Sequence, residues 1–173
     1  MLEFLVLSLP TAVYLVVRRR APDAVSVMGL RAGSSGDYAW AAVIAAGLAT
    51  VSWAVLTWGI DVDVHGAGMT GRITGVVSGV AVVLRAAGEE VFFRGFVTGL
   101  LARRLVSILG NLVQAVVFLL PHLLLLLVDV RLWPILPVQA VAGWLMGWLR
   151  LRHGSVLPAI GVHSVLNLVA TLG

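Results

Sequence analysis

Residues 107–128, SILGNLVQAVVFLLPHLLLLLV, contain no charged side chain from end to end. A transmembrane α-helix needs about 20 consecutive, mostly apolar residues, so this segment is long enough to cross a bilayer. The composition of the whole chain agrees, because 60% of its 173 residues are hydrophobic and 12% are charged, against about 25% charged residues in a soluble domain. We therefore expect an all-α membrane protein.

Other segments of the chain are apolar and long enough, or nearly so, to span as well. Together with the first, they are 2–17, 38–60, 72–100, 107–128, 132–149 and 155–172. The pattern predicts one integral-membrane domain over residues 1–173, a bundle of about six transmembrane helices around a buried polar cavity. Residues 1–71 would form two N-terminal helices with their loops, and residues 72–173 would form the core that carries the polar motifs.

Two of these segments fit a simple span less well. Segment 2–17 is short, and we expect it to tilt or to lie partly in the membrane interface. Segment 72–100 is too long for one straight span. It is expected to form either a long helix that extends out of the membrane or a helix that is broken near Gly88. The stretch 18–37, which contains proline and several glycines, is predicted to be a linker.

The charges between the segments predict a topology. All twelve basic residues are arginine, and the strongly basic junctions at 18–20, 103–104 and 150–152 fall on one side if six helices cross. The positive-inside rule places that side in the cytoplasm and both termini outside. Such short, scattered clusters argue against nucleic-acid binding. The arginine-only composition without cysteine indicates a prokaryotic plasma membrane and excludes disulfides and thiolate nucleophiles.

Glu89 and Glu90 are the first candidate functional residues, because charge is expensive in an apolar helix, about 2.5–3.5 kcal/mol for each group at the helix centre. Glu90 and Arg94 are four residues apart and are predicted to pair on one helix face. Glu89 points about 100° away from Glu90, so we expect a free carboxylate that acts as a general base. The alternative is a helix end at the membrane surface with solvated charges.

His122 is the only strongly polar side chain between Gln114 and Asp129. Pro121 removes one backbone hydrogen bond and is expected to bend the helix locally, which would open space beside the histidine. The alternative is a buried histidine that only hydrogen-bonds to a neighbour.

His163 and Asn167 are also four residues apart and are predicted to lie on one helix face, where both can donate hydrogen bonds to the same point. Two such polar groups could instead bind one helix to another. His65 and His153 are expected to be solvated. In lipid, the three polar groups turn inward and meet, and they supply what peptide hydrolysis requires: a base for water and donors for an oxyanion.

The motifs Glu-Glu-x-x-x-Arg, Phe-x-x-x-His and His-x-x-x-Asn, in this order, resemble the signature of the CPBP family of intramembrane proteases, which comprises CaaX-processing endopeptidases and bacteriocin-processing or Abi proteins. The resemblance covers about residues 85–170. It implies an intramembrane endopeptidase that acts on a membrane-associated peptide or protein near the cytoplasmic face, with membrane lipids as its other partners.

The resemblance also implies a role for each motif residue. Glu89 and His122 would activate the attacking water, His163 and Asn167 would form the oxyanion hole, and Glu90 with Arg94 would hold the site in shape. Phe118 is the motif residue that precedes His122. The family has been described both as zinc-dependent and as metal-free, and Glu89, His122 and His163 could supply three zinc ligands. The chain departs from the family in Pro121, which stands where a small residue is usual.

Two other functions fit the same residues. A non-catalytic immunity or scaffold protein would keep the motif residues as polar contacts between helices. A small transporter would use Glu89 and Glu90 as a proton or cation site, although this leaves the pairing of His163 with Asn167 unexplained.

Overall fold

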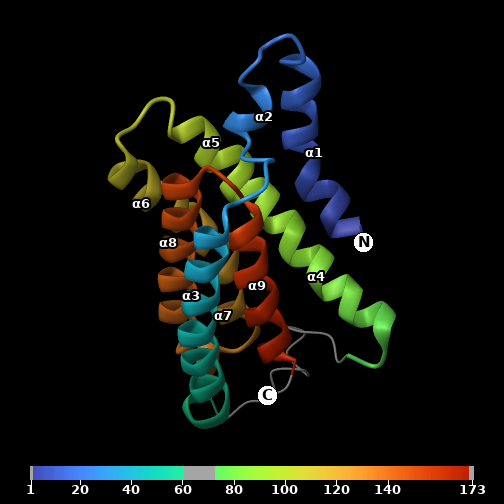
Figure 1. Cartoon of the computed structure of the whole chain (residues 1–173). Helices are drawn as coiled ribbons and strands as arrows, with labels where there is room; N and C mark the ends of the chain where they lie inside the picture. The colour runs from blue at the N-terminus through green and yellow to red at the C-terminus, as the bar shows by residue number, and fades with distance from the viewer. Residues whose placement is uncertain (1, 61–72, 172–173) are drawn as a thin grey trace.

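The computed structural model describes residues 2–60 and 73–171, and the described chain is helical, with no β-strand (Figure 1). Helices, including the π-helical segments η1 and η2 and the 3-10 turn η3, follow in this order: α1 (Leu2–Val17), α2 (Ala24–Val27), α3 (Ser35–Ala54), η1 (Val55–Gly59), α4 (Val76–Glu90), η2 (Val91–Val97), α5 (Thr98–Leu101), α6 (Ser107–His122), α7 (Leu125–Val128), η3 (Val130–Leu132), α8 (Ile135–His153) and α9 (Leu157–Ala170).

Two of the described helical stretches are long and apolar enough to cross a membrane. They are Ser35–Gly59 and Ser107–Val128. α1 and α9 are apolar as well but shorter. The prediction of an all-α chain is confirmed, and each of the six expected segments contains a helix.

α3 begins earlier than expected from hydropathy, at Ser35 instead of residue 38. The reason is a capping box: the Ser34 hydroxyl accepts from the Asp37 amide at 3.3 Å, and an Asp37 carboxylate oxygen accepts from the Ser34 amide at 2.7 Å. Such reciprocal bonds satisfy two amides that the first helical turn leaves without partners. The predicted linker 18–37 therefore ends in the first turn of α3, and it also contains the short helix α2.

One of the two alternatives for segment 72–100 was a helix broken near Gly88. The structure has no break there. α4, η2 and α5 follow each other without a gap, and the hydrogen bonds change to the π pattern only from Val91 to Val97 (Figure 1). A π-helical turn inserts extra residues into a helix and occurs often at functional sites. Here it directly follows Glu89 and Glu90 and contains Arg94, so the candidate site lies where the helix changes its hydrogen-bond pattern.

Pro121 was expected to bend the helix locally, and the helix is interrupted directly after His122. α6 ends at His122, two residues interrupt the helix, and α7 resumes at Leu125. The turn after α7 is closed by Arg131, which contacts the Asp129 carboxylate at 2.7 Å and holds the pKa of Asp129 below its usual value. The predicted span 107–128 is thus two helices in series, with His122 at the junction.

The core of the bundle lies between α3, α6, α8 and α9. Phe118, Ala142, Met146 and Leu149 are completely buried there. α1 packs along one side, against α4 and η2 (Figure 1). Burial of these apolar side chains gives the helices fixed positions, about which the polar residues are arranged.

α1 and α4 approach each other closely at Gly88, because a Cβ at this position would lie 2.8 Å from the Cα of Phe4. We predict that Gly88→Ala pushes α1 away from α4 and lowers the melting temperature in detergent by about 2–10 °C. Gly79 lies in the same helix, where the nearest atom to an added Cβ is 4.0 Å away, so Gly79→Ala is the matched control and should be neutral or mildly stabilising. Equal melting temperatures for both variants would contradict this packing.

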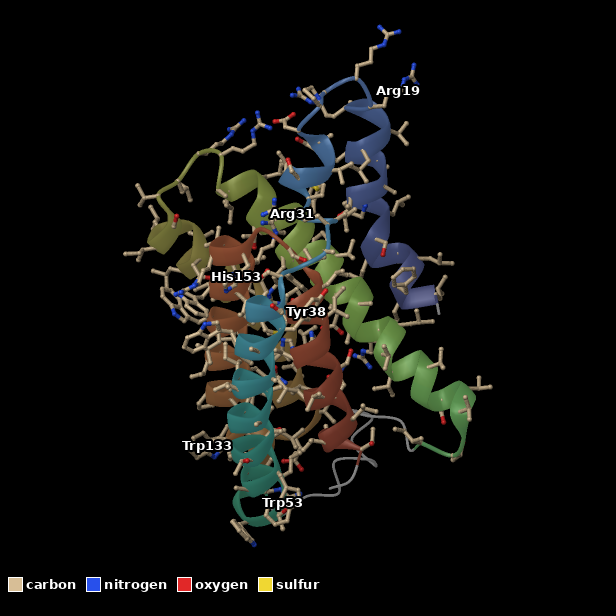
Figure 2. All side chains as sticks on the ribbon, in the orientation of Figure 1. Arg19, Arg31, Tyr38, Trp53, Trp133 and His153 are labelled. Atoms are coloured by element: carbon tan, nitrogen blue, oxygen red, sulfur yellow. The ribbon has the colours of Figure 1, made fainter. Side chains whose placement is uncertain are left out.

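Arginines gather toward one end of the molecule (Figure 2). Arg103 pairs with Asp23 at 2.9 Å, and Arg31 donates to the backbone carbonyl of His153 at 2.8 Å. Figure 2 shows Arg19, Arg31 and His153 toward this end and Trp53 and Trp133 toward the other. Trp40 and Trp148 lie at the basic end, beside Arg152 of α8, and tryptophans toward both ends are typical of helices that sit in a bilayer.

Two residues at the basic end behave differently from the prediction. His153, expected to be solvated, is 14% exposed and contacts the Asp37 carboxylate at 2.6 Å. Arg150 is buried; its Nε donates to the Arg94 carbonyl at 3.1 Å and its Nη2 to the Val27 carbonyl at 2.7 Å. Both contacts join residues that are far apart in sequence, so the spacing of charges along α8 gave no sign of them. His65 lies outside the described residues.

Candidate functional site

A cavity of about 580 Å³ opens between the helices. Four predicted site residues line it: Glu89 from α4, His122 from the end of α6, and His163 and Asn167 from α9. The rest of the lining comes from α1, η1, α8 and their neighbours and is mostly aliphatic. The fold therefore brings to one space four polar side chains that the sequence spreads over about half of the chain.

Glu89 is not the free carboxylate that was expected. Its Oε1 accepts from Nε of Arg85 at 3.2 Å, one helical turn earlier, and the same nitrogen lies 3.5 Å from the Glu3 carboxylate of α1. The Glu89 side chain is 15% exposed. Its i,i+4 spacing from Arg85 was visible in the sequence, in the same way as the spacing of Glu90 and Arg94, and could have predicted the pair.

Glu90 lies behind the cavity instead of lining it, and its pair with Arg94 is confirmed. Arg94 Nη1 and Glu90 Oε1 are 2.7 Å apart, and both side chains are fully buried. The same carboxylate oxygen lies 2.7 Å from Nδ1 of His163. Glu90 therefore joins Arg94 to His163, a contact between α4 and α9 that the sequence did not indicate.

Phe118 is completely buried and packs against His122, His163 and Arg94. Its ring lies 4.7 Å from the ring of His122 and 5.9 Å from that of His163, and the Arg94 guanidinium lies 4.2 Å from its centroid. A cation over an aromatic face is attracted by the ring quadrupole. One side chain thus positions two candidate catalytic histidines and the buried arginine.

Gln114 was not predicted as a site residue, but it contacts the same part of α8 as Arg94. It is fully buried, and its Nε2 donates to the Gly143 carbonyl at 2.9 Å, the oxygen that also accepts from Arg94 Nη2 at 3.1 Å. Gln114 and Phe118 are four residues apart on α6, so they share a face. The available signal was a glutamine in a predominantly apolar span, three residues after Asn111, whose Oδ1 accepts from Gln114 Nε2 at 2.8 Å.

His122 has a defined orientation at the end of α6. Its Nδ1 lies 2.9 Å from the backbone carbonyl of Phe118. A carbonyl only accepts, so Nδ1 carries the proton and Nε2 of the neutral ring is the basic nitrogen. His122 lines the same cavity as Glu89 and His163. The expected space beside this histidine is part of the cavity.

His163 and Asn167 share one face of α9, as their spacing predicted. His163 is buried, and its Nε2 lies 3.7 Å from Oε2 of Glu89. Asn167 is partly exposed to the cavity, and within the described chain its carboxamide makes no hydrogen bond. A donor without a partner at the wall of a cavity is available to a ligand.

The donors do not fit a three-ligand zinc site in this arrangement. Among residues 2–60 and 73–171, no three His, Asp or Glu side chains lie in a group that could hold a metal ion. Glu89 and His163 approach each other, but Nδ1 of His163 is engaged by Glu90, and His122 does not complete a cluster with them.

Comparison with known proteins bears on this site. Residues 74–169 match the family model of type II CAAX prenyl endopeptidases, described as Rce1-like. The matched stretch covers more than half of the chain and contains every cavity residue singled out above except Glu3. No curated protein and no solved structure matches the chain.

Proposed function

Because the chain belongs to the Rce1-like family of type II CAAX prenyl endopeptidases, a protease family, we propose that it is an intramembrane endopeptidase. It hydrolyses a peptide bond in a membrane-associated protein or peptide. The observation that carries the proposal is the meeting of Glu89, His122, His163 and Asn167 at one largely aliphatic cavity. Family membership and the two candidate spans together indicate a membrane protein.

Glu89 and His122 activate the attacking water in this proposal. The basic Nε2 of His122 and the Glu89 carboxylate both border the cavity, so a water between them loses a proton as its oxygen attacks the carbonyl carbon. The carbon–nitrogen bond then breaks, and the leaving amine takes up the proton that the base received. A positioned base contributes about 10²–10⁴-fold to such a step.

His163 and Asn167 stabilise the oxyanion. The Asn167 carboxamide donates directly, since it has no other partner in the described chain. Because Nδ1 of His163 faces the Glu90 carboxylate at 2.7 Å, Nε2 donates only when the ring carries both protons. Glu90 offsets the charge of that ring, and Arg94 in turn offsets Glu90. Donors fixed before the reaction stabilise developing charge without reorganisation.

We propose an orientation in the membrane from the charges at the two ends of the molecule. The arginine-rich end takes the cytoplasmic side under the positive-inside rule, with the tryptophans of the other end near the outer surface (Figure 2). The cavity lining includes Val55 of η1 and Ile135 at the start of α8, close in sequence to Trp53 and Trp133 at the end opposite Arg19 (Figure 2), so the substrate enters from the lipid or from that end. A prokaryotic plasma membrane and a peptide or regulatory membrane protein as substrate complete the proposal.

The function is tested by comparing membrane peptides from cells that carry the wild type or His122→Ala. We expect shortened membrane peptides only with the wild type, because His122→Ala removes the basic Nε2 and lowers cleavage by about 10²–10⁴-fold. His153→Ala is the control, since His153 lies at the basic end and pairs with Asp37. Identical peptide profiles for the wild type and His122→Ala would contradict the protease function. Ion flux in liposomes that depends on Glu89 would favour a transporter instead.

A further inference from the structure

The guanidinium of Arg85 lies in the cavity wall beside Glu89 and uses only part of its hydrogen-bonding capacity. Arg85 lines the cavity, and its side chain is 47% exposed. Within the described chain, the only hydrogen bond of this guanidinium runs from Nε to Glu89. The two terminal nitrogens, Nη1 and Nη2, therefore remain available as a pair of parallel donors.

Arg85 is also the only arginine among the described residues that line the cavity. Arg94, the other arginine of this helix near the site, is fully buried and engaged by Glu90 and Gly143. The fork of a guanidinium matches the two oxygens of a carboxylate, and such bidentate pairs are stronger and more directional than neutral hydrogen bonds. The chemistry of this wall therefore favours a carboxylate ligand.

Glu3 occupies the neighbourhood of Arg85 without binding it firmly. Its carboxylate lies 3.5 Å from Nε of Arg85 and forms no hydrogen bond with it. The Glu3 side chain is 59% exposed and lies in the first turn of α1. An exposed ion pair of this kind contributes little to stability, so a second carboxylate can replace Glu3 at small cost.

We propose that Arg85 binds a carboxylate of the peptide substrate, displaces Glu3 from its side, and so determines where the peptide is cut. This inference rests on the proposed endopeptidase function. The guanidinium touches the Glu89 carboxylate, and an extended peptide advances about 3.3 Å per residue. A carboxylate on Arg85 therefore lies within a few residues of the bond that Glu89 attacks.

The experiment uses three peptides that carry an N-terminal fluorophore, an S-farnesyl cysteine and three aliphatic residues. The first ends in a free carboxylate, the second in a carboxamide, and the third in a glutamate whose own terminus is a carboxamide. Binding is measured by fluorescence anisotropy on the full chain in detergent, with His122→Ala to prevent turnover. Cleavage of the same peptides is measured on the wild type. The third peptide separates a terminal carboxylate from a side-chain carboxylate as the source of the charge.

We expect a carboxylate peptide to bind about 10–100-fold more tightly than the second peptide. Arg85→Gln should reduce this ratio to within about threefold, and Arg85→Lys should restore part of it, because lysine keeps the charge without the fork. Glu3→Gln should tighten binding of the carboxylate peptide by about two- to fivefold. Arg103→Gln is the matched control, since Arg103 is 45% exposed and pairs with Asp23 at the basic end.

The ratio between peptides separates binding from support of Glu89. If Arg85→Gln weakens all three peptides equally, Arg85 only positions Glu89 and the inference is wrong. It is also wrong if the His122→Ala chain with Arg85 intact binds the three peptides equally well or binds none of them. Binding with the predicted preference but without cleavage by the wild type would overturn the protease function and leave the carboxylate site standing. Cleavage of all three peptides at equal rates would support the protease function and contradict the carboxylate site.

Discussion

Glu89→Gln should lower peptide cleavage by about 10²–10⁴-fold, because an amide of the same size cannot accept a proton from water. The loss should appear in kcat, since the cavity keeps its shape and its other donors. Glu89 is 15% exposed and contacts Arg85 through an oxygen that glutamine retains. The melting temperature in detergent should therefore stay within a few degrees of the wild type. Both quantities are measured on the same purified protein.

The matched control for this variant is Asp23→Asn. Asp23 is also a carboxylate paired with an arginine, at 2.9 Å from Arg103, but lies on the exposed basic end of the molecule. The Asp23→Asn variant should cleave the peptide at the wild-type rate. Glu89→Asp keeps the charge and shortens the side chain, so we expect an intermediate rate. Turnover by Glu89→Gln within about threefold of the wild type would remove Glu89 from the mechanism.

Local spacing in the sequence predicted the parts of the fold and of the site that lie within one helix. The pairs Glu90–Arg94 and His163–Asn167 are both i,i+4, and both share a helix face in the structure. The apolar stretch 107–128 was recognisable because lipid requires a long, uncharged helix. Hydropathy was less informative at helix ends, where Ser34 and Asp37 start α3 through hydrogen bonds and not through apolarity.

Contacts between distant residues could not be predicted in this way. The bond from His163 to Glu90, 73 positions apart, depends on how α4 and α9 pack, and the same holds for the pair of His153 with Asp37. The π-helical turn after Glu90 was not visible either, because its backbone pattern has no sequence signal as clear as that of proline. Arg85 was visible but unassigned, since one helix offered two arginines to two glutamates.

Arg94→Met should destabilise the protein more than any other single change considered above. It leaves the Glu90 carboxylate, which is fully buried, without its arginine partner, and only Nδ1 of His163 remains beside it. Removal of one member of a buried ion pair costs about 3–5 kcal/mol, which corresponds to a fall in melting temperature of about 6–20 °C for a chain of this size. It also removes the guanidinium from the ring of Phe118 and the donor from the Gly143 carbonyl. Thermal unfolding in detergent measures the effect.

The double variant Glu90→Gln with Arg94→Met separates the structural from the catalytic part of this pair. Two neutral side chains of similar volume can pack where the ion pair was, so most of the lost stability should return. Activity should stay low, because the carboxylate that offsets a charged His163 is gone and the glutamine in its place carries no charge. Recovery of both stability and cleavage would show that Glu90 and Arg94 hold the helices together without assisting His163. Recovery of neither would show that the buried charges themselves determine how α4 and α9 pack.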